Sequence, residues 1–517
     1  MIQSANIFFR NYLPAVLLLA VTIYSCSKND GPKYATPVIS KTIADTIDVK
    51  VGAKASIPLQ INAGGGAKSV VVYKKNGFLV ETPVAANATA FVYETEALPE
   101  TMEEGDLLVY EFLVANLDGT DSEKISVVIR AEVYSKITMG TTSLYNIEIP
   151  DEGIVSGGTT IKLIKGRNYY LSSSLTFDAG ARLQIEEGVH VYMNADADDA
   201  INLYVSGEAD IKGSASNPVV FTSSKTLLSG ATPDAGDWNS FRLNGTGSGS
   251  NNGAVDYLRL EYGGDNPFRL SNVGAETAIS HVQVFKATSE GVMITNGNAR
   301  LKYIVATDCF EGSYRLGDSY AGLMQFVISV NSKYFQENDD FAIRETASPV
   351  IANATILGPG TGASNTHGIR MRASAAPKMY NCIVSQFPRR GVRVVDNVQV
   401  TNLDGLAVFA YSYVFNVPSD PYRDNGVLFA GTFNADGTPL QNTFYNNVLA
   451  KTGNNYTLST ITGIGVGDFV PDAETTSAFN PTTLNSFFTA APFVGAVKND
   501  AEDWTKGWVK NADGTIR

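Results

Sequence analysis

Short runs of alternating apolar and polar residues, separated by Gly, Asn and Asp, fill the chain from about residue 140 to residue 450. The runs Leu183–Gly188 and Leu203–Gly207 both read apolar-x-apolar before a glycine. Four later runs follow one another at spacings of about 22 to 28 residues: 255–262, 279–285, 301–306 and 324–330. Short strands at this period, with no helical pattern between them, predict a right-handed parallel β-helix over residues 140–450.

A longer segment recurs 28 residues on, with Pro and Asn at the same places, and supports this fold. Residues 349–356 (PVIANATI) recur at 377–384 (PKMYNCIV). Coils in register would stack Asn353 over Asn381, as identical side chains do in stacked strands. A β-propeller would need a period nearer 40 to 50 residues, roughly that of a four-stranded blade.

Residues 37–135 show a different alternation, which predicts a separate β-sandwich. The run 69–73 leads to Asn76-Gly77, a strong hairpin signal, and the run 107–114 leads through Asp118-Gly119 to residues 125–129. Six or seven strands in about 100 residues indicate an Ig-like module. A spacer role is favoured, and a small carbohydrate-binding module is the alternative.

The N-terminus has the layout of an export signal. Arg10 precedes an apolar run over residues 12–24, which ends at Ser25-Cys26. This end resembles the bacterial lipobox, which implies removal of residues 1–25, acylation of Cys26 and attachment to a membrane. Residues 26–36 read as a flexible tether. Residues 27–30 (SKND) resemble the tag that sends Bacteroidetes lipoproteins to the cell surface, which implies an outer-membrane location.

Composition narrows the function classes. The net charge of −13 argues against nucleic acid as the main partner. Only Cys309 and Cys382 lie in the body of the chain, and the repeat register places them about three coils apart. This separation exceeds the roughly 7 Å that a disulfide spans, so free buried thiols are expected.

Several segments together resemble a known family. The segments are 217–223 (NPVVFTS), 236–238 (GDW), 255–264 (VDYLRLEYGG), 368–372 (GIRMR), 383–388 (IVSQFP), 492–496 (PFVGA) and 504–508 (WTKGW). They are similar to pectin-lyase-like right-handed parallel β-helix lipoproteins of the Bacteroidetes outer membrane. The resemblance covers roughly residues 140–517. It implies an all-β fold and an envelope location more than any activity.

No catalytic set stands out. His190, His281 and His367 lack metal-ligand spacing, and no nucleophile elbow or P-loop is present. His281 alternates with Val282 and Val284 and is expected to face outward. The acidic loop 337–340 (ENDD) is a possible Ca²⁺ site, although such loops are more often only solvated.

One segment carries clustered arginines. Setting the coils in register aligns Arg344 with Arg372 and Arg370 with Arg393, and Arg389 and Arg390 follow in a neighbouring loop. Arginine forks suit carboxylate and sulfate, so this stripe is a candidate site for an anionic polysaccharide. The competing interpretation is a set of surface ion pairs with Glu337, Glu345 and Asp396.

Residues 451–517 are expected to form loops and a cap over the last coil, with Trp504 and Trp508 packed inside it. Three functions stay open: a non-catalytic surface lipoprotein that binds a glycan or serves an outer-membrane transporter, a polysaccharide lyase or glycosidase, and a structural or adhesive protein.

Overall fold

The computed structural model describes residues 34–333, 339–360, 366–394, 407–418, 420–423 and 461–517. Cys26 lies outside these residues. The chain divides into two compact units. The first unit comprises the residues up to Leu98 together with Leu107–Arg130. The second unit comprises Pro99–Asp106 and Ala131–Arg517. Within the described residues, no helix is long and apolar enough to cross a bilayer.

The first unit consists of two antiparallel sheets. The smaller has the order β1–β3–β6 and the larger has the order β2–β8–β7–β4–β5. Tyr93 of β6 contacts Tyr110 and Phe112 of β7, with ring centroids 5.8 and 5.6 Å apart, so the two sheets face each other. The strands are β1 (Val38–Lys41), β2 (Thr46–Lys50), β3 (Ser56–Asn62), β4 (Ala67–Lys74), β5 (Gly77–Pro83), β6 (Ala90–Glu94), β7 (Leu107–Asn116) and β8 (Ile125–Glu132).

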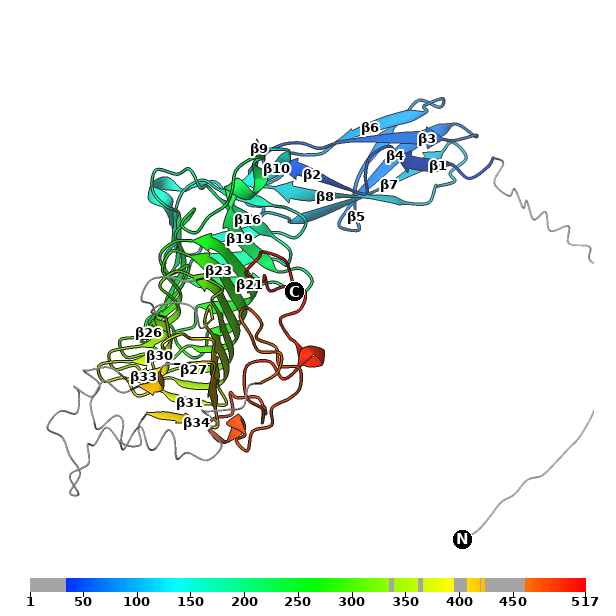
Figure 1. The fold of residues 1–517 in the computed structure, drawn as a ribbon. Coiled ribbons are helices and arrows are strands. Elements are labelled where there is room, and N and C mark those ends of the chain that lie inside the picture. The colour runs from blue at the N-terminus through cyan, green and yellow to red at the C-terminus, as the bar shows by residue number, and fades with distance from the viewer. Residues whose placement is uncertain (1–33, 334–338, 361–365, 395–406, 419, 424–460) are drawn as a thin grey trace, which may run out of the picture. The chain divides into compact units, whose positions relative to one another are not determined.

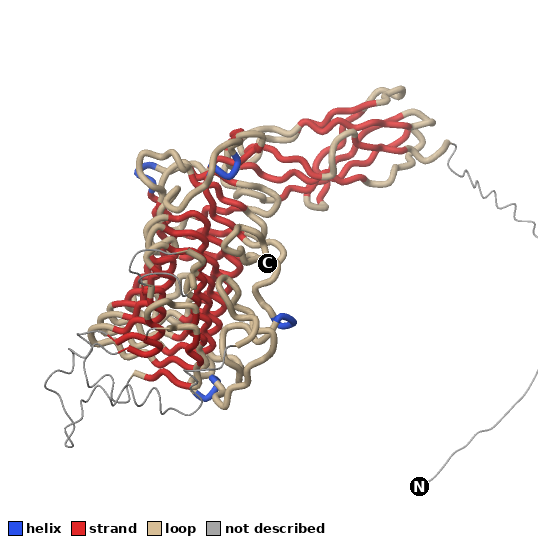
Figure 2. Tube along the Cα trace, in the orientation of Figure 1, coloured by secondary structure: helices blue, strands red, loops and turns tan. Residues whose placement is uncertain are grey.

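The second unit is a parallel β-helix, and Figure 2 shows its strands stacked coil upon coil. One strand of each coil joins an eleven-stranded parallel sheet. Its members, in order, are β11 (Ile154–Val155), β14 (Leu175–Phe177), β17 (Asn202–Val205), β20 (Ser240–Asn244), β22 (Phe268–Ser271), β24 (Glu290–Thr295), β26 (Gly312–Gly317), β28 (Asp339–Ile343), β30 (His367–Met371), β33 (Arg390–Val394) and β36 (Asp420–Arg423).

The other strands form what we call the bent sheet. In the early and late coils it has two short strands per coil, and in the middle coils these merge into one long strand. The short strands are β12 (Thr160–Leu163), β13 (Tyr169–Leu171), β15 (Arg182–Ile185), β16 (His190–Met193), β18 (Glu208–Lys212), β19 (Val219–Ser223), β31 (Lys378–Tyr380), β32 (Ile383–Ser385), β34 (Val408–Ala410) and β35 (Tyr413–Phe415). The long strands are β21 (Gly253–Gly263), β23 (Ala278–Ala287), β25 (Arg300–Cys309), β27 (Leu323–Val330) and β29 (Val350–Leu357).

Alternation places one apolar residue of each strand above its counterpart in the next coil. Phe241 stacks on Phe268 and Tyr314 stacks on Phe341, and all four side chains are fully buried. The thiols of Cys309 and Cys382 are free and buried in the same interior, which confirms the prediction for both. A single continuous core therefore runs through the coils.

The long strands bend at residues with positive φ. Tyr257, His281, Tyr303 and Phe326 occupy one column of such bends, with φ between 50° and 60°. Their rings stack at centroid distances of 4.0, 4.5 and 4.9 Å. His281 faces outward, as expected, but it is sandwiched between two tyrosines and packed against Trp504 and Trp508, so it is not an ordinary surface residue.

Asn353 and Asn381 continue the same column of bends, each with a φ of 56° and no exposed surface. The short polar side chain of asparagine tolerates this conformation better than most. Their amide groups donate to backbone carbonyls of residues 479–493. The predicted stacking of the two asparagines holds, but they serve to bind another segment.

The first coils are closed by an antiparallel hairpin, β9 (Ser135–Met139) and β10 (Thr142–Asn146), and by residues 99–106. Glu104 of that segment forms a fully buried ion pair with Arg167 and accepts a hydrogen bond from the backbone N–H of Val133 at 2.7 Å. Removing either partner would leave an uncompensated buried charge, which costs about 3–5 kcal/mol. This pair fixes the N-terminal end of the helix.

Residues 461–517, which we call the C-terminal strap, lie along the outer face of the bent sheet and include two short 3₁₀ turns, Pro481–Thr483 and Asp500–Glu502 (Figure 1). The described part of this segment therefore lies along the side of the β-helix and not over the last coil, where the cap was expected. The strap runs back from Asn381 to Arg259, whose guanidinium donates to the carbonyl of Trp508 at 2.7 Å. Trp504 and Trp508 pack edge-on against the ring of His281.

Two buried glutamines hold the strap as an extended peptide. The side-chain amide of Gln283 donates to the carbonyl of Lys510 and accepts from its N–H, both at 2.8 Å. Gln325 does the same with Thr489, at 2.9 and 2.8 Å. Each glutamine side chain thus supplies the pair of hydrogen bonds that a neighbouring strand would otherwise provide to the strap backbone.

Replacing both glutamines (Gln283→Ala with Gln325→Ala) should loosen the strap, because four hydrogen bonds worth about 1 kcal/mol each are lost. We expect amide exchange in residues 489–510 to rise about a thousandfold, measured by hydrogen exchange and mass spectrometry. Gln184→Ala, at a half-buried position of β15, is the matched control. Equal protection of the strap in both variants would contradict this role.

Candidate anionic-ligand site

Arginines occupy one register position along the eleven-stranded sheet. Pairing sets Arg242 beside Arg269, and continues through Met293, Arg315 and Ala342 to Arg370, Arg393 and Arg423. Neighbouring strands lie about 4.8 Å apart. We call Arg242, Arg269, Arg315, Arg370 and Arg393 the arginine ladder.

The predicted stripe overlaps this ladder at two of its six arginines. Arg370 pairs in register with Arg393, as predicted. Arg344 and Arg372 directly follow the paired residues Ile343 and Met371, so they too lie in neighbouring coils. Arg389 and Arg390 lie at the start of β33, where Arg390 pairs in register with His367. All six predicted arginines therefore lie on or beside three consecutive strands, β28, β30 and β33.

Sequence reasoning missed the earlier half of the ladder. Arg242, Arg269 and Arg315 each lie in the centre of a strand, between an aromatic residue and a leucine. The repeated triplets Phe-Arg-Leu, Phe-Arg-Leu and Tyr-Arg-Leu are the signal that could have found them. The irregular spacing of 27 residues from 242 to 269 and 46 from 269 to 315 concealed their alignment.

The ladder side chains are half-buried, and several lack partners. Arg242 donates to the hydroxyl of Ser271 at 3.1 Å and lies over the ring of Tyr204. The Nε–H groups of Arg242, Arg269, Arg315, Arg370 and Arg393 have no hydrogen-bond partner among the described residues. Burial and the neighbouring arginines lower the pKa of Arg242 and Arg393. The ladder is therefore a row of guanidinium groups that are partly shielded from solvent.

Two carboxylates offset part of this charge. Glu290 lies 3.7 Å from Arg315 and 3.8 Å from Arg344, and Asp339 forms an ion pair with Arg370. These are not the predicted partners: Glu345 accepts from the backbone N–H of Asp318, and Glu337 and Asp396 lie outside the described residues. Of the predicted arginines, Arg344 and Arg370 thus form ion pairs, but with acids other than those expected.

His367 lies beneath the ladder beside Asp339, with Nδ1 3.3 Å from Oδ1 of that carboxylate. Burial lowers the pKa of His367, and Asp339 opposes this shift. The pKa of Asp339 is itself lowered despite burial, because His367 and Arg370 favour its charged form. The imidazole side chain is only 6% exposed, so a ligand on the sheet would not reach it.

Asp340 belongs to the inner wall of the helix. It is fully buried and accepts hydrogen bonds from Ser313, Ser329 and Asn331. Burial raises the pKa of this carboxyl to about 6. The described half of the acidic loop 337–340 is thus engaged by protein donors, since Asp339 pairs with Arg370. These two carboxylates do not fit a Ca²⁺ site, and the described residues contain no cluster of three metal-ligating side chains.

A sequence profile of the pectate-lyase-like β-helix domain matches residues 154–249 and 240–509. The chain belongs to this family. The matched residues include every ladder arginine and most of the C-terminal strap. Membership in the pectate-lyase-like family confirms the predicted parallel β-helix, and it bears on fold more than on chemistry.

Other comparisons add little to the family assignment. No curated protein matches the chain. One solved structure, of fibronectin(III)-like modules of Clostridium thermocellum CbhA, is 12% identical over 19% of this chain, with a TM-score of 0.15. The match spans 47% of that protein's chain. Similarity at this level supports no conclusion about the fold or the function of this chain.

The buried Asp340 makes stability depend on pH. Its pKa in the folded protein, about 6, exceeds the ordinary value of 3.8, so the folded state holds a proton that the unfolded state releases. Stability should therefore fall as pH rises from about 4 to about 6, by about 3 kcal/mol.

Asp340→Asn should remove this fall, because the amide cannot ionise. Urea unfolding between pH 4 and pH 7 measures the slope. Asp178→Asn, which changes an exposed turn carboxyl, is the control and should keep the wild-type profile. A variant at position 340 that still loses 3 kcal/mol over this range would show that another group titrates.

Proposed function

We propose that this pectate-lyase-like β-helix is the binding domain of a surface lipoprotein, and that it holds an extended anionic polysaccharide along the arginine ladder. One observation carries the proposal: six arginines, the five of the ladder and Arg423, share one register position on a single sheet. Two carboxylates, Glu290 and Asp339, offset the charge of Arg315, Arg344 and Arg370.

The ladder chemistry favours carboxylate or sulfate groups. A guanidinium presents two parallel N–H donors that match either group. A row of such donors at strand spacing suits a polymer with a regular series of negative groups. The chain as a whole has a net charge of −13, so its acidic surfaces repel such a polymer and the basic row is the place where it would bind. Such a site would bind along several sugar units.

Catalysis is less well supported. A general base must reach the proton that it abstracts, within about 3 Å or through one water. The imidazole nitrogens of His367 have no accessible surface, and Asp339 is engaged by Arg370. The geometry around the ladder therefore favours binding without cleavage.

The location rests on the N-terminal sequence. An acylated Cys26 would anchor the chain in the outer membrane, with residues 27–36 as a tether and the Ig-like module at 37–135 as a spacer. This arrangement would hold the β-helix away from the membrane. A carbohydrate-binding protein placed there could serve an uptake system or adhesion, and both uses share the same ladder.

Removing unpaired ladder arginines should weaken polysaccharide binding. Arg269→Ala and Arg393→Ala each delete a guanidinium that forms no ion pair within the described residues, so the fold should persist. We expect about tenfold weaker affinity for each, since a charged hydrogen bond contributes about 1.5–3 kcal/mol. Calorimetry with polygalacturonate and dextran sulfate measures the change.

The matched control is Arg182→Ala, which removes the same charge from the bent sheet, where Arg182 pairs with Glu208. Wild-type protein should release either polymer at 1 M salt, where screening acts within about 3 Å, and should not bind neutral dextran. Equal affinity of the ladder and control variants would refute the site. Appearance of unsaturated uronate during incubation would instead establish a lyase.

The lipid anchor has its own test. Wild-type protein expressed in a Gram-negative host should incorporate radiolabelled palmitate and sediment with the outer membrane, and Cys26→Ser should do neither. Ser25→Ala keeps a small residue before the cysteine and should stay acylated. Labelling of the Cys26→Ser protein would exclude lipidation at this residue.

A further inference from the structure

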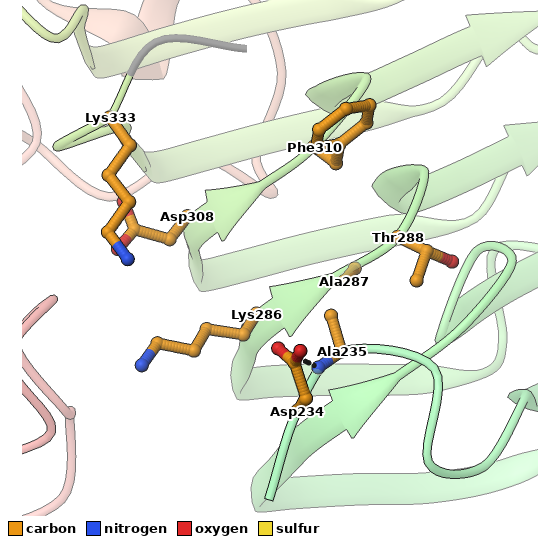
Figure 3. Close-up of a pocket in the computed structure, with 8 residues that line it drawn as sticks. All are labelled: Asp234, Ala235, Lys286, Ala287, Thr288, Asp308, Phe310 and Lys333. Atoms are coloured by element: carbon orange, nitrogen blue, oxygen red, sulfur yellow. Dashed lines mark hydrogen bonds between the residues drawn. The ribbon is translucent and has the colours of Figure 1, made fainter.

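Glu290 is a buried carboxylate beside the arginine ladder, and it begins β24. It pairs in register with the first residue of β26. The turns that lead into these two strands lie at a hollow of about 360 Å³, and Figure 3 shows Thr288 and Phe310 on them. The hollow also contains Lys286 and Lys333, but within the described residues neither lysine forms an ion pair with Glu290. The cations that act on this carboxylate are therefore arginines.

Two arginines flank the carboxylate of Glu290. Its Oε1 lies 3.7 Å from Nη1 of Arg315 and 3.8 Å from Nη2 of Arg344. Both distances exceed the length of a charged hydrogen bond, which is about 2.7–2.9 Å. The Nε–H groups of both arginines also have no hydrogen-bond partner among the described residues. Glu290 thus offsets charge on this face without fixing either guanidinium in a direct hydrogen bond.

Asp339, the other carboxylate of this face, is held more firmly. Arg370 donates to it directly, and Nδ1 of His367 lies 3.3 Å from its other oxygen. The pKa of Asp339 is therefore lowered despite burial. Burial raises the pKa of Glu290 above the ordinary value of 4.5, because it outweighs the attraction of the two arginines. Glu290 is thus the carboxylate of the two that takes up a proton more readily as the solution becomes acidic.

The other charged groups near Glu290 also favour its protonated form. Glu311, on the exposed turn of the next coil, raises the pKa of Glu290 further. On the preceding coil, the exposed carboxylate of Asp265 accepts a hydrogen bond from the hydroxyl of Ser289, the residue before Glu290, at 2.9 Å. Like charges disfavour ionisation of a carboxyl group. Within the described residues, the two arginines are thus the groups that keep Glu290 charged.

A polyanion at the ladder would compete with Glu290 for these two arginines. The side chains of Arg315 and Arg344 are 33% and 21% exposed, so a ligand can reach them. A bound sulfate or carboxylate would draw the guanidinium groups away from Glu290 and place a negative charge near it. Both effects favour protonation of Glu290. By linkage, protonation of Glu290 must in turn strengthen ligand binding.

We propose that polyanion binding at the ladder is coupled to proton uptake by Glu290, which makes this residue a pH-dependent determinant of affinity. The inference rests on the proposed function of the ladder and adds its regulation. Affinity should rise as the pH falls from about 7 to about 5, because a neutral Glu290 no longer competes for Arg315 and Arg344.

Calorimetry with dextran sulfate on the full-length protein tests the coupling, because sulfate esters stay ionised across this pH range. We expect about tenfold tighter binding at pH 5 than at pH 7, and a binding heat that varies with the ionisation heat of the buffer, as proton uptake requires. Glu290→Gln should bind at pH 7 about as tightly as the wild type does at pH 5, and should lose most of the pH dependence. A carboxylate that only supported the fold would, when replaced, weaken binding instead.

Glu311→Gln is the matched control, since it removes the same charge from an exposed turn and should keep the wild-type pH dependence. Asp340→Asn should keep it too, because that carboxyl contacts no arginine among the described residues. Absence of binding at every pH would refute the ladder itself. Equal affinity at pH 5 and pH 7 would leave the ladder in place and overturn the coupling. Weaker binding by Glu290→Gln at pH 7, or a pH dependence that disappears only in His367→Gln, would overturn it as well.

Discussion

Registered stacking of parallel strands is the constraint on which the rest of the second unit depends. Each coil cannot bury its apolar residues alone, so each residue must lie above its counterpart in the next coil. Phe241 over Phe268 and Tyr314 over Phe341 satisfy this condition in the interior. The same condition forces outward residues into columns as well. A chemical group repeated once per coil becomes a row, whatever its distance along the sequence.

The arginine ladder is such a row, and stacking makes it energetically unfavourable in isolation. Like charges on adjacent strands repel, and partial burial strengthens the repulsion. The lowered pKa values of Arg242 and Arg393 express this cost. Buried Glu290 and Asp339 reduce this cost for their neighbours, but Arg269 has no carboxylate partner among the described residues. A bound polyanion would supply negative charge to the arginines that these two carboxylates do not neutralise. For this reason we interpret the row as a binding surface.

The bent sheet uses its columns differently. Its left-handed bends carry a stack of aromatic rings and then two asparagines, and beside them the buried glutamines Gln283 and Gln325 bind the strap backbone. One face of the helix is thus occupied by the protein's own C-terminal segment, with a second apolar cluster beneath it. The eleven-stranded sheet is left to carry the unpaired charges.

The repeat of alternating runs determined the parallel β-helix, the two free buried thiols and the alignment of Arg370 with Arg393, because periodic burial is written directly in residue order. Tertiary structure decided the rest. Loops of unequal length hid Arg242, Arg269 and Arg315 from any fixed period. The path of the strap depends on amide contacts between residues more than 100 positions apart, such as Gln325 with Thr489. Alternation correctly placed His281 on the outer face, but its cover comes from Trp504 and Trp508, more than 200 positions further along the chain, which residue order alone does not reveal.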